Sequence, residues 1–102
     1  MATGGEVEAW REALIAEALL GVGRKAEALE RAENAAAIAK ERGLLWSLPR
    51  ALSISAEARI ANGEPGAGEL LDEAGRVARD TSQMVELQAI ERARNAAPAA
   101  QT

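Results

Sequence analysis

Apolar residues recur along the chain at intervals of three and four residues, which is the period of an amphipathic α-helix. Glycine, proline and short polar residues interrupt this pattern and divide the chain into five stretches, each of a usual helix length. The pattern therefore predicts an all-α chain of five helices. We expect them over about residues 6–20 and 25–42, from about residue 47, after residues 64–65, and over about residues 82–94.

Each predicted helix carries an apolar stripe that we expect to face the core. The stripe of the first helix contains Val7, Trp10 and Leu14, whereas the stripe of the second consists largely of alanine, which lets a neighbouring helix approach closely. Ser47 is expected to cap the third helix, because the nearby Pro49 is tolerated only in a first helical turn. Trp46 precedes this helix, and its place beside the turn at Gly43 favours a core position.

The chain contains an internal repeat of about 40 residues. Residues 15–23 align with residues 55–63 at an offset of 40, sharing Ala-Glu-Ala and a final glycine, and residues 38–41 align with residues 77–80 at an offset of 39. A helix, a glycine turn, a second helix and a loop thus occur twice, and the fifth helix would open a third copy. Such periods are typical of helical solenoids. Chance similarity in an alanine-rich chain is the alternative.

Residues 23–29, Gly-Arg-Lys-Ala-Glu-Ala-Leu, resemble the G-x-x-x-E-A-L core of tetratricopeptide (TPR) repeats. This resemblance implies that Ala16 and Ala56 lie where two helices cross closely. Gly66-Ala-Gly68 departs from the pattern, and the usual aromatic positions lack aromatic residues, so the chain resembles a divergent version.

Residues 39–46, Ala-Lys-Glu-Arg-Gly-Leu-Leu-Trp, are similar to the unit ends in the TPR regions of large bacterial LuxR-family and cyclase-type signalling regulators. The resemblance spans about residues 6–94. It implies antiparallel helical hairpins that stack as a short TPR-like solenoid of about five helices. Residues 1–5 are expected to form a flexible N-terminus and residues 95–102 a disordered tail.

Composition narrows the chemistry that the 102 residues can perform. The chain has neither cysteine nor histidine, so it lacks the thiolate and imidazole groups that most often bind metals or act as a general base. Its four serines stand in no catalytic motif. We therefore expect no enzymatic activity, no catalytic residue, no metal and no cofactor.

Charge and hydropathy exclude two further classes of partner. Sixteen acidic residues against 12 basic ones give a net charge of −4, which argues against direct nucleic-acid binding. No stretch approaches the roughly 20 apolar residues that a membrane span requires, so we expect no membrane partner. The acidic N-terminus does not resemble a secretory signal, and we expect a cytoplasmic protein.

The numerous glutamates suggest a cation site, but solvated helix faces explain them better. We assign Glu12 to such a face, and the spacing of Glu27 and Arg31 predicts an ion pair within one helix.

Trp10 is the residue that is most informative about binding. The TPR resemblance places it where first-helix side chains point into a concave groove, and a core position is equally supported. Tryptophan and arginine dominate interface energies, which favours peptide recognition if the groove position is right. The resemblance implies that two matching sets of residues line the groove: Trp10, Ala13, Glu17 and Leu20 from the first copy, and Arg50, Ser53, Glu57 and Ile60 from the second.

These observations predict a non-enzymatic protein-interaction module that binds a peptide or protein partner in the groove. The alternatives are a ligand-sensing or regulatory helical-repeat domain of a bacterial transcriptional regulator, and a plain homodimeric helical bundle. The stripe of the fifth helix (Met84, Leu87 and Ile90) has no following helix to cover it. We therefore expect a homodimer or part of a longer repeat array.

Overall fold

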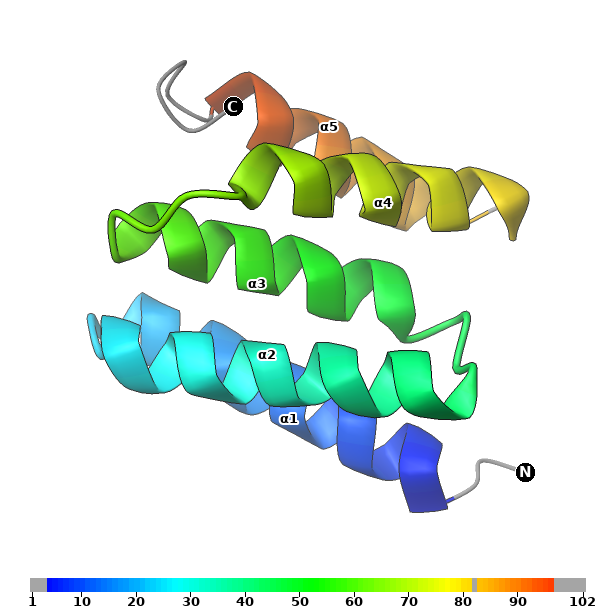
Figure 1. Ribbon diagram of the computed structural model, residues 1–102, viewed down its shortest axis with the longest axis horizontal. Helices are drawn as coiled ribbons and strands as arrows, with labels where there is room; N and C mark the ends of the chain where they lie inside the picture. Colours follow the sequence, from blue (N-terminus) through cyan, green and yellow to red (C-terminus); the bar gives the residue numbers. More distant parts are fainter. Residues whose placement is uncertain (1–3, 82, 97–102) are drawn as a thin grey trace.

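The computed structural model describes residues 4–81 and 83–96, and this part of the chain is entirely α-helical apart from its turns and loops (Figure 1). The prediction of an all-α protein with five helices is confirmed. The helices are α1 (Gly4–Gly21), α2 (Lys25–Arg42), α3 (Leu48–Ala61), α4 (Ala67–Asp80) and α5 (Met84–Ala96).

The ends of the helical region differ slightly from the prediction. α1 begins at Gly4 and α5 ends at Ala96, so helix extends two residues beyond the predicted 6–94 domain at each end. The predicted flexible N-terminus and disordered tail otherwise fall on residues 1–3 and 97–102, which lie outside the described residues.

Each helix packs on the next one along the chain, and α3 also contacts α1 and α5. In Figure 1, α1 passes behind α2 and α5 passes behind α4, and α3 lies between these two pairs. The described part measures 40 × 27 × 20 Å. This arrangement makes α3 the central helix, with the helix pairs on either side covering it.

The turns that end α1 and α3 are built alike. The N–H groups of Gly23 and Gly63 each donate to a carbonyl three residues earlier at 3.1 Å, and the next N–H in each turn closes a second bond at 2.9 and 2.8 Å. Both glycines have a positive φ, of 83° and 69°, which a residue with a side chain rarely adopts. These bonds satisfy the last carbonyls of each helix. The turn that ends α2 contains the same pair of bonds, from Gly43 and Leu44, so this motif ends successive helices and is not specific to the offset of 40.

A backbone bond over the same number of residues closes the turns that end α2 and α4. The N–H of Leu44 donates to Ala39, and that of Gln83 donates to Ala78, both at 2.8 Å.

Small side chains make up much of the core. Four alanines of α2 are buried, as its alanine stripe predicts, and they allow α1 and α3 to approach it closely. Larger apolar side chains of α3 and α4 are buried too, and Leu52 and Leu71 are among the largest side chains that are fully enclosed. Ala16 and Ala56 are both completely buried, consistent with close helix crossings.

The face of α1 that the structure buries is not the one that its larger apolar residues predict. Val7, Trp10 and Leu14 remain 54%, 46% and 41% exposed, whereas the alanines at 9, 13 and 16 point into the core. α1 carries apolar residues on most of its circumference, so periodicity alone cannot select its inner face. Its alanine face permits the closest approach to α2 and α3.

Two expectations at the start of α3 and one in α5 are wrong. Trp46 is 65% exposed rather than in the core, because it lies in the α2–α3 loop before the helix begins. Ser47 occupies the N-cap position but its side chain makes no capping bond, since its backbone is already helical (ψ −24°). Within the α5 stripe, Ile90 is buried and Leu87 partly buried in the same cluster as α3 and α4 residues, so neither needs a further helix to cover it, whereas the Met84 side chain lies outside the described residues.

Candidate functional site

Arg50 of α3 joins three helices on one face of the molecule. One guanidinium nitrogen, Nη2, donates to both carboxylate oxygens of Glu17 on α1 at 2.8 and 2.9 Å. The other, Nη1, lies 3.6 Å from a carboxylate oxygen of Glu86 on α5. The guanidinium carbon also lies over the Trp10 ring, 5.5 Å from its centroid, within the range of a cation–π interaction.

Glu57 lies two turns after Arg50 on the same helix. Desolvation by the surrounding protein, followed by the negative charge of Glu17, raises the pKa of Glu57, while the positive charge of Arg50 opposes the shift. The Glu57 side chain nevertheless keeps considerable contact with solvent. We refer to Trp10, Glu17, Arg50, Glu57 and Glu86 as the Arg50 face. With three carboxylates and one guanidinium, this face carries a net negative charge.

The structure brings some of the predicted groove residues together and buries others. Four members of the predicted set, Trp10, Glu17, Arg50 and Glu57, belong to the Arg50 face. Ala13 and Ser53 are buried, and the Ser53 hydroxyl donates to the Arg50 carbonyl at 3.3 Å. Leu20 and Ile60 are partly buried. Leu20 packs against the alanine-rich cluster of α1, α2 and α3, and Ile60 packs against the cluster that contains Leu52 and Leu71.

Glu86 is the member of this face that the sequence analysis missed. Extending the 39-residue offset into the fifth helix aligns Glu86 with Ser47, at the start of α3. That alignment places it near Arg50, but the stripe of the fifth helix gave no reason to consider its polar residues.

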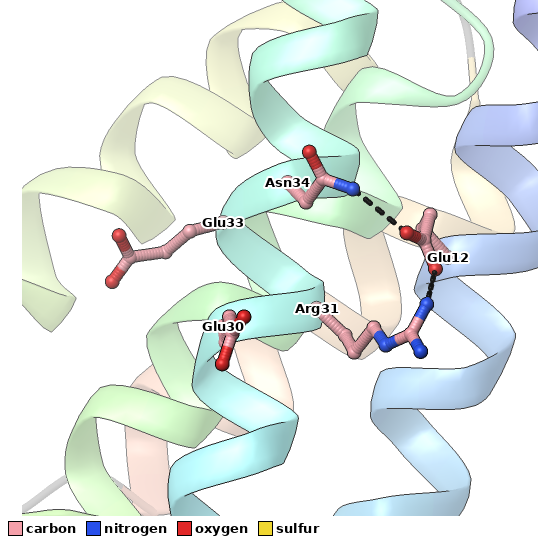
Figure 2. A pocket seen from close by; sticks show the side chains of 5 residues that line it. All are labelled: Glu12, Glu30, Arg31, Glu33 and Asn34. Carbon is pink, nitrogen blue, oxygen red and sulfur yellow. Dashed lines mark hydrogen bonds and ion pairs between the residues drawn. The ribbon is translucent and has the colours of Figure 1, made fainter.

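Glu12 forms a second polar cluster, between α1 and α2 (Figure 2). Its two carboxylate oxygens accept bonds of 2.7 Å from Arg31 Nη1 and from Asn34 Nδ2. Burial by itself raises the pKa of Glu12, but these two bonds and the nearby positive charges outweigh it and lower the pKa overall. The expectation that Glu12 is solvated is wrong, and Arg31 pairs with Glu12 rather than with Glu27.

The depression around Glu12 has a volume of about 560 Å³ and is open to solvent. Glu30 and Glu33 of α2 also line it, and Figure 2 shows that Glu33 points away from Glu12. Since both oxygens of Glu12 are already bonded within the protein, this cluster fastens α1 to α2. A smaller open depression of about 330 Å³ lies on α5 and is likewise polar.

Within residues 4–81 and 83–96, no group of three or more acidic side chains is arranged to hold a metal ion. None of the described helices is both long and apolar enough to cross a bilayer. Comparison with protein-family models, with curated proteins and with solved structures gives no match for this chain. The Arg50 face is therefore the candidate site, on the strength of its own geometry.

Proposed function

We propose that this chain is a non-enzymatic protein-interaction module of the TPR type, which binds a peptide on the Arg50 face. In this proposal α1–α2 and α3–α4 are successive hairpins of a short solenoid, and α5 opens a third. The packing of each helix on the next one along the chain supports this arrangement, as do the contacts of α3 with α1 and α5.

The observation that carries the proposal is the convergence of α1, α3 and α5 on Arg50. A binding surface made by one helix from each hairpin requires side chains of these helices to meet on one face. The hydrogen bonds from Arg50 to Glu17, its ion pair with Glu86 and its contact with Trp10 provide that meeting point. A side chain held in this way loses little conformational freedom on binding, which favours affinity.

The charges of the face indicate a basic partner. The three carboxylates of Glu17, Glu57 and Glu86 exceed the single positive charge of Arg50, and desolvation together with the neighbouring Glu17 raises the pKa of Glu57. A lysine or arginine from a partner offsets this excess of negative charge, and its cationic group can also contact the half-exposed Trp10 ring. We therefore infer a peptide with a net positive charge.

Selection from a phage-displayed library of short random peptides tests this proposal. Panning on the immobilised chain is expected to enrich basic peptides, and Trp10→Ala is expected to weaken the best of them about 30-fold, the loss of a typical hot spot. Trp46→Ala is the matched control, since Trp46 is the other exposed tryptophan and makes no contact with Arg50 among those described. Enrichment of acidic peptides, or equal effects of the two substitutions, would contradict the proposal.

The alternative of a ligand-sensing domain gains less support. A small-molecule site is usually enclosed and largely apolar. The two depressions described above are open and lined by charged or polar side chains. Peptide binding on an exposed face is the function that these surfaces favour.

A further inference from the structure

The outer face of α1 is the equivalent of a face that α3 buries. The 40-residue offset aligns Leu14 of α1 with Ile54 of α3, and Val7 with Ser47. Leu14 is 41% exposed, whereas Ile54 is 2% exposed. Ile54 is covered because it packs on the alanines of α1 and α2, the preceding helix pair. Leu14 has the same place in its own helix but no such helix pair to pack on.

Other residues on the outer side of α1 also match small or apolar residues of α3 at the offset of 40. Ala18 corresponds to Ala58 and Arg11 to Ala51, so three of the four outer positions of α1 are apolar. We call Val7, Leu14 and Ala18 the α1 outer face. α1 is apolar around most of its circumference, which is typical of a helix that is covered on more than one side.

The other end of the molecule, formed by α5, is polar where the α1 end is apolar. The 39-residue offset aligns Gln88, Glu91 and Asn95 of α5 with three residues by which α3 packs against its neighbours, namely Pro49, Leu52 and Ala56. The α5 residues are polar and exposed to solvent. A polar outer helix is how helical arrays terminate. The α5 end therefore presents polar side chains to solvent, whereas the α1 end presents apolar ones.

We propose that the α1 outer face packs against the same face of a second copy of this chain, about a two-fold axis. Head-to-tail association would place Val7 and Leu14 against the polar α5 end, so the two surfaces do not match. Pairing α1 with α1 brings apolar side chains together and closes the assembly at two chains. Arg11 is accommodated because its long stem can lie along apolar surface while its charge stays in water.

The proposed α1–α1 contact is small. An α-helix of 18 residues is about 27 Å long, so a contact made by α1 alone buries less than the roughly 800 Å² per partner of a stable complex. We therefore expect a weak, reversible dimer rather than a permanent one. This proposal rests on the outer face and not on the Arg50 face, so either proposal can fail without the other.

Sedimentation equilibrium over a wide range of chain concentrations tests the proposal. The wild-type chain is expected to pass from one to two chains per particle, and Leu14→Glu is expected to raise the dissociation constant at least 10-fold while far-ultraviolet circular dichroism shows unchanged helicity. Leu45→Glu is the matched control, because Leu45 is 49% exposed but lies in the α2–α3 loop. It should leave the dimer intact.

Cross-linking gives a second measurement that does not disturb the apolar face with a charge. The chain has no cysteine, so Ala18→Cys introduces a unique thiol on the outer face and Gln88→Cys introduces one on α5. A bifunctional maleimide should link two chains at position 18 and not at position 88. The proposal is overturned by a monomer at every concentration, by open-ended oligomers, by a dimer that Leu14→Glu leaves unchanged, or by equal cross-linking at both positions.

Discussion

Replacing Ala16 by leucine tests the packing of α1 against α2 and α3 through alanine side chains. Ala16 is completely buried and belongs to a cluster in which α1, α2 and α3 meet through small side chains. Its companions there include Ala32, Ala35 and Ala51, so few long side chains are present that could move aside. The three additional carbon atoms of leucine must therefore displace backbone.

Overpacking of this kind costs about 1–3 kcal/mol of the free energy of unfolding. For a domain of about 100 residues, each kcal/mol lowers the thermal midpoint by about 4–8 °C. We thus expect Ala16→Leu to unfold at least about 4 °C below the wild-type chain. Thermal and urea denaturation followed by circular dichroism measure both quantities, and an unchanged urea m-value would show that the folded state remains compact.

Ala37→Leu is the matched control for this substitution. Ala37 also lies within a helix, but its side chain is exposed, so leucine at this position has room and keeps a high helix propensity. We expect it to change stability by no more than about 0.5 kcal/mol. If Ala16→Leu were as harmless as Ala37→Leu, the close approach of α1 to its neighbours would be wrong.

Three further substitutions probe the core and the two acidic clusters. Leu71→Ala should cost about 2–5 kcal/mol in the same urea assay, because it leaves a cavity at a fully buried position. Glu12→Gln should lower the thermal midpoint at neutral pH. Because the folded state lowers the pKa of Glu12, its contribution to stability should disappear as the pH falls below the ordinary value of 4.5 and through the folded pKa. Glu57→Gln should raise the midpoint at neutral pH. Because the pKa of Glu57 is raised, the wild-type chain should equal this variant below about pH 4.5 and fall behind it as the pH rises through the folded pKa.

The helix boundaries were the most predictable part of the fold. Residues 25–42 were predicted as one helix and form α2 with these bounds, because glycines at 23 and 43 adopt left-handed conformations that end the neighbouring helical segments. The start of α4 was less predictable. Its N-terminal cap is Gly66 with a φ of 96°, and no sequence signal distinguishes this glycine from Gly63, in the preceding turn, or from Gly68, which lies within α4.

The orientation of α1 was not predictable, for a physical reason. Periodicity identifies an inner face only where the other faces are polar, and α1 is apolar on most sides. Its alanine face was selected by the alanines of α2, which are complementary in shape and lie on a different segment of the chain. Burial of Glu12 depended in the same way on Arg31 and Asn34, which are 19 and 22 residues away.

The candidate site was partly predictable because the repeat relates its two halves. Trp10 and Glu17 occupy the same positions in α1 as Arg50 and Glu57 occupy in α3, so the offset of 40 predicted that they share a face. The repeat could not predict which side chains would touch. Arg50 reaches both members of the first copy and also Glu86, and this choice depends on how far α1 and α5 lie from α3.

Trp10 and Leu14 lie one turn apart on α1, so the two proposed interactions use neighbouring residues that make different contacts, and substitutions at each can separate them. Trp10 and Glu17 face Arg50 of α3, whereas Leu14 faces away from the core at the end of the molecule. Loss of the Trp10 side chain should therefore weaken peptide binding without changing the state of association, and Leu14→Glu should do the reverse. If both substitutions weakened both properties equally, the outer face and the Arg50 face would have to be one surface, with the partner peptide bound across the dimer contact.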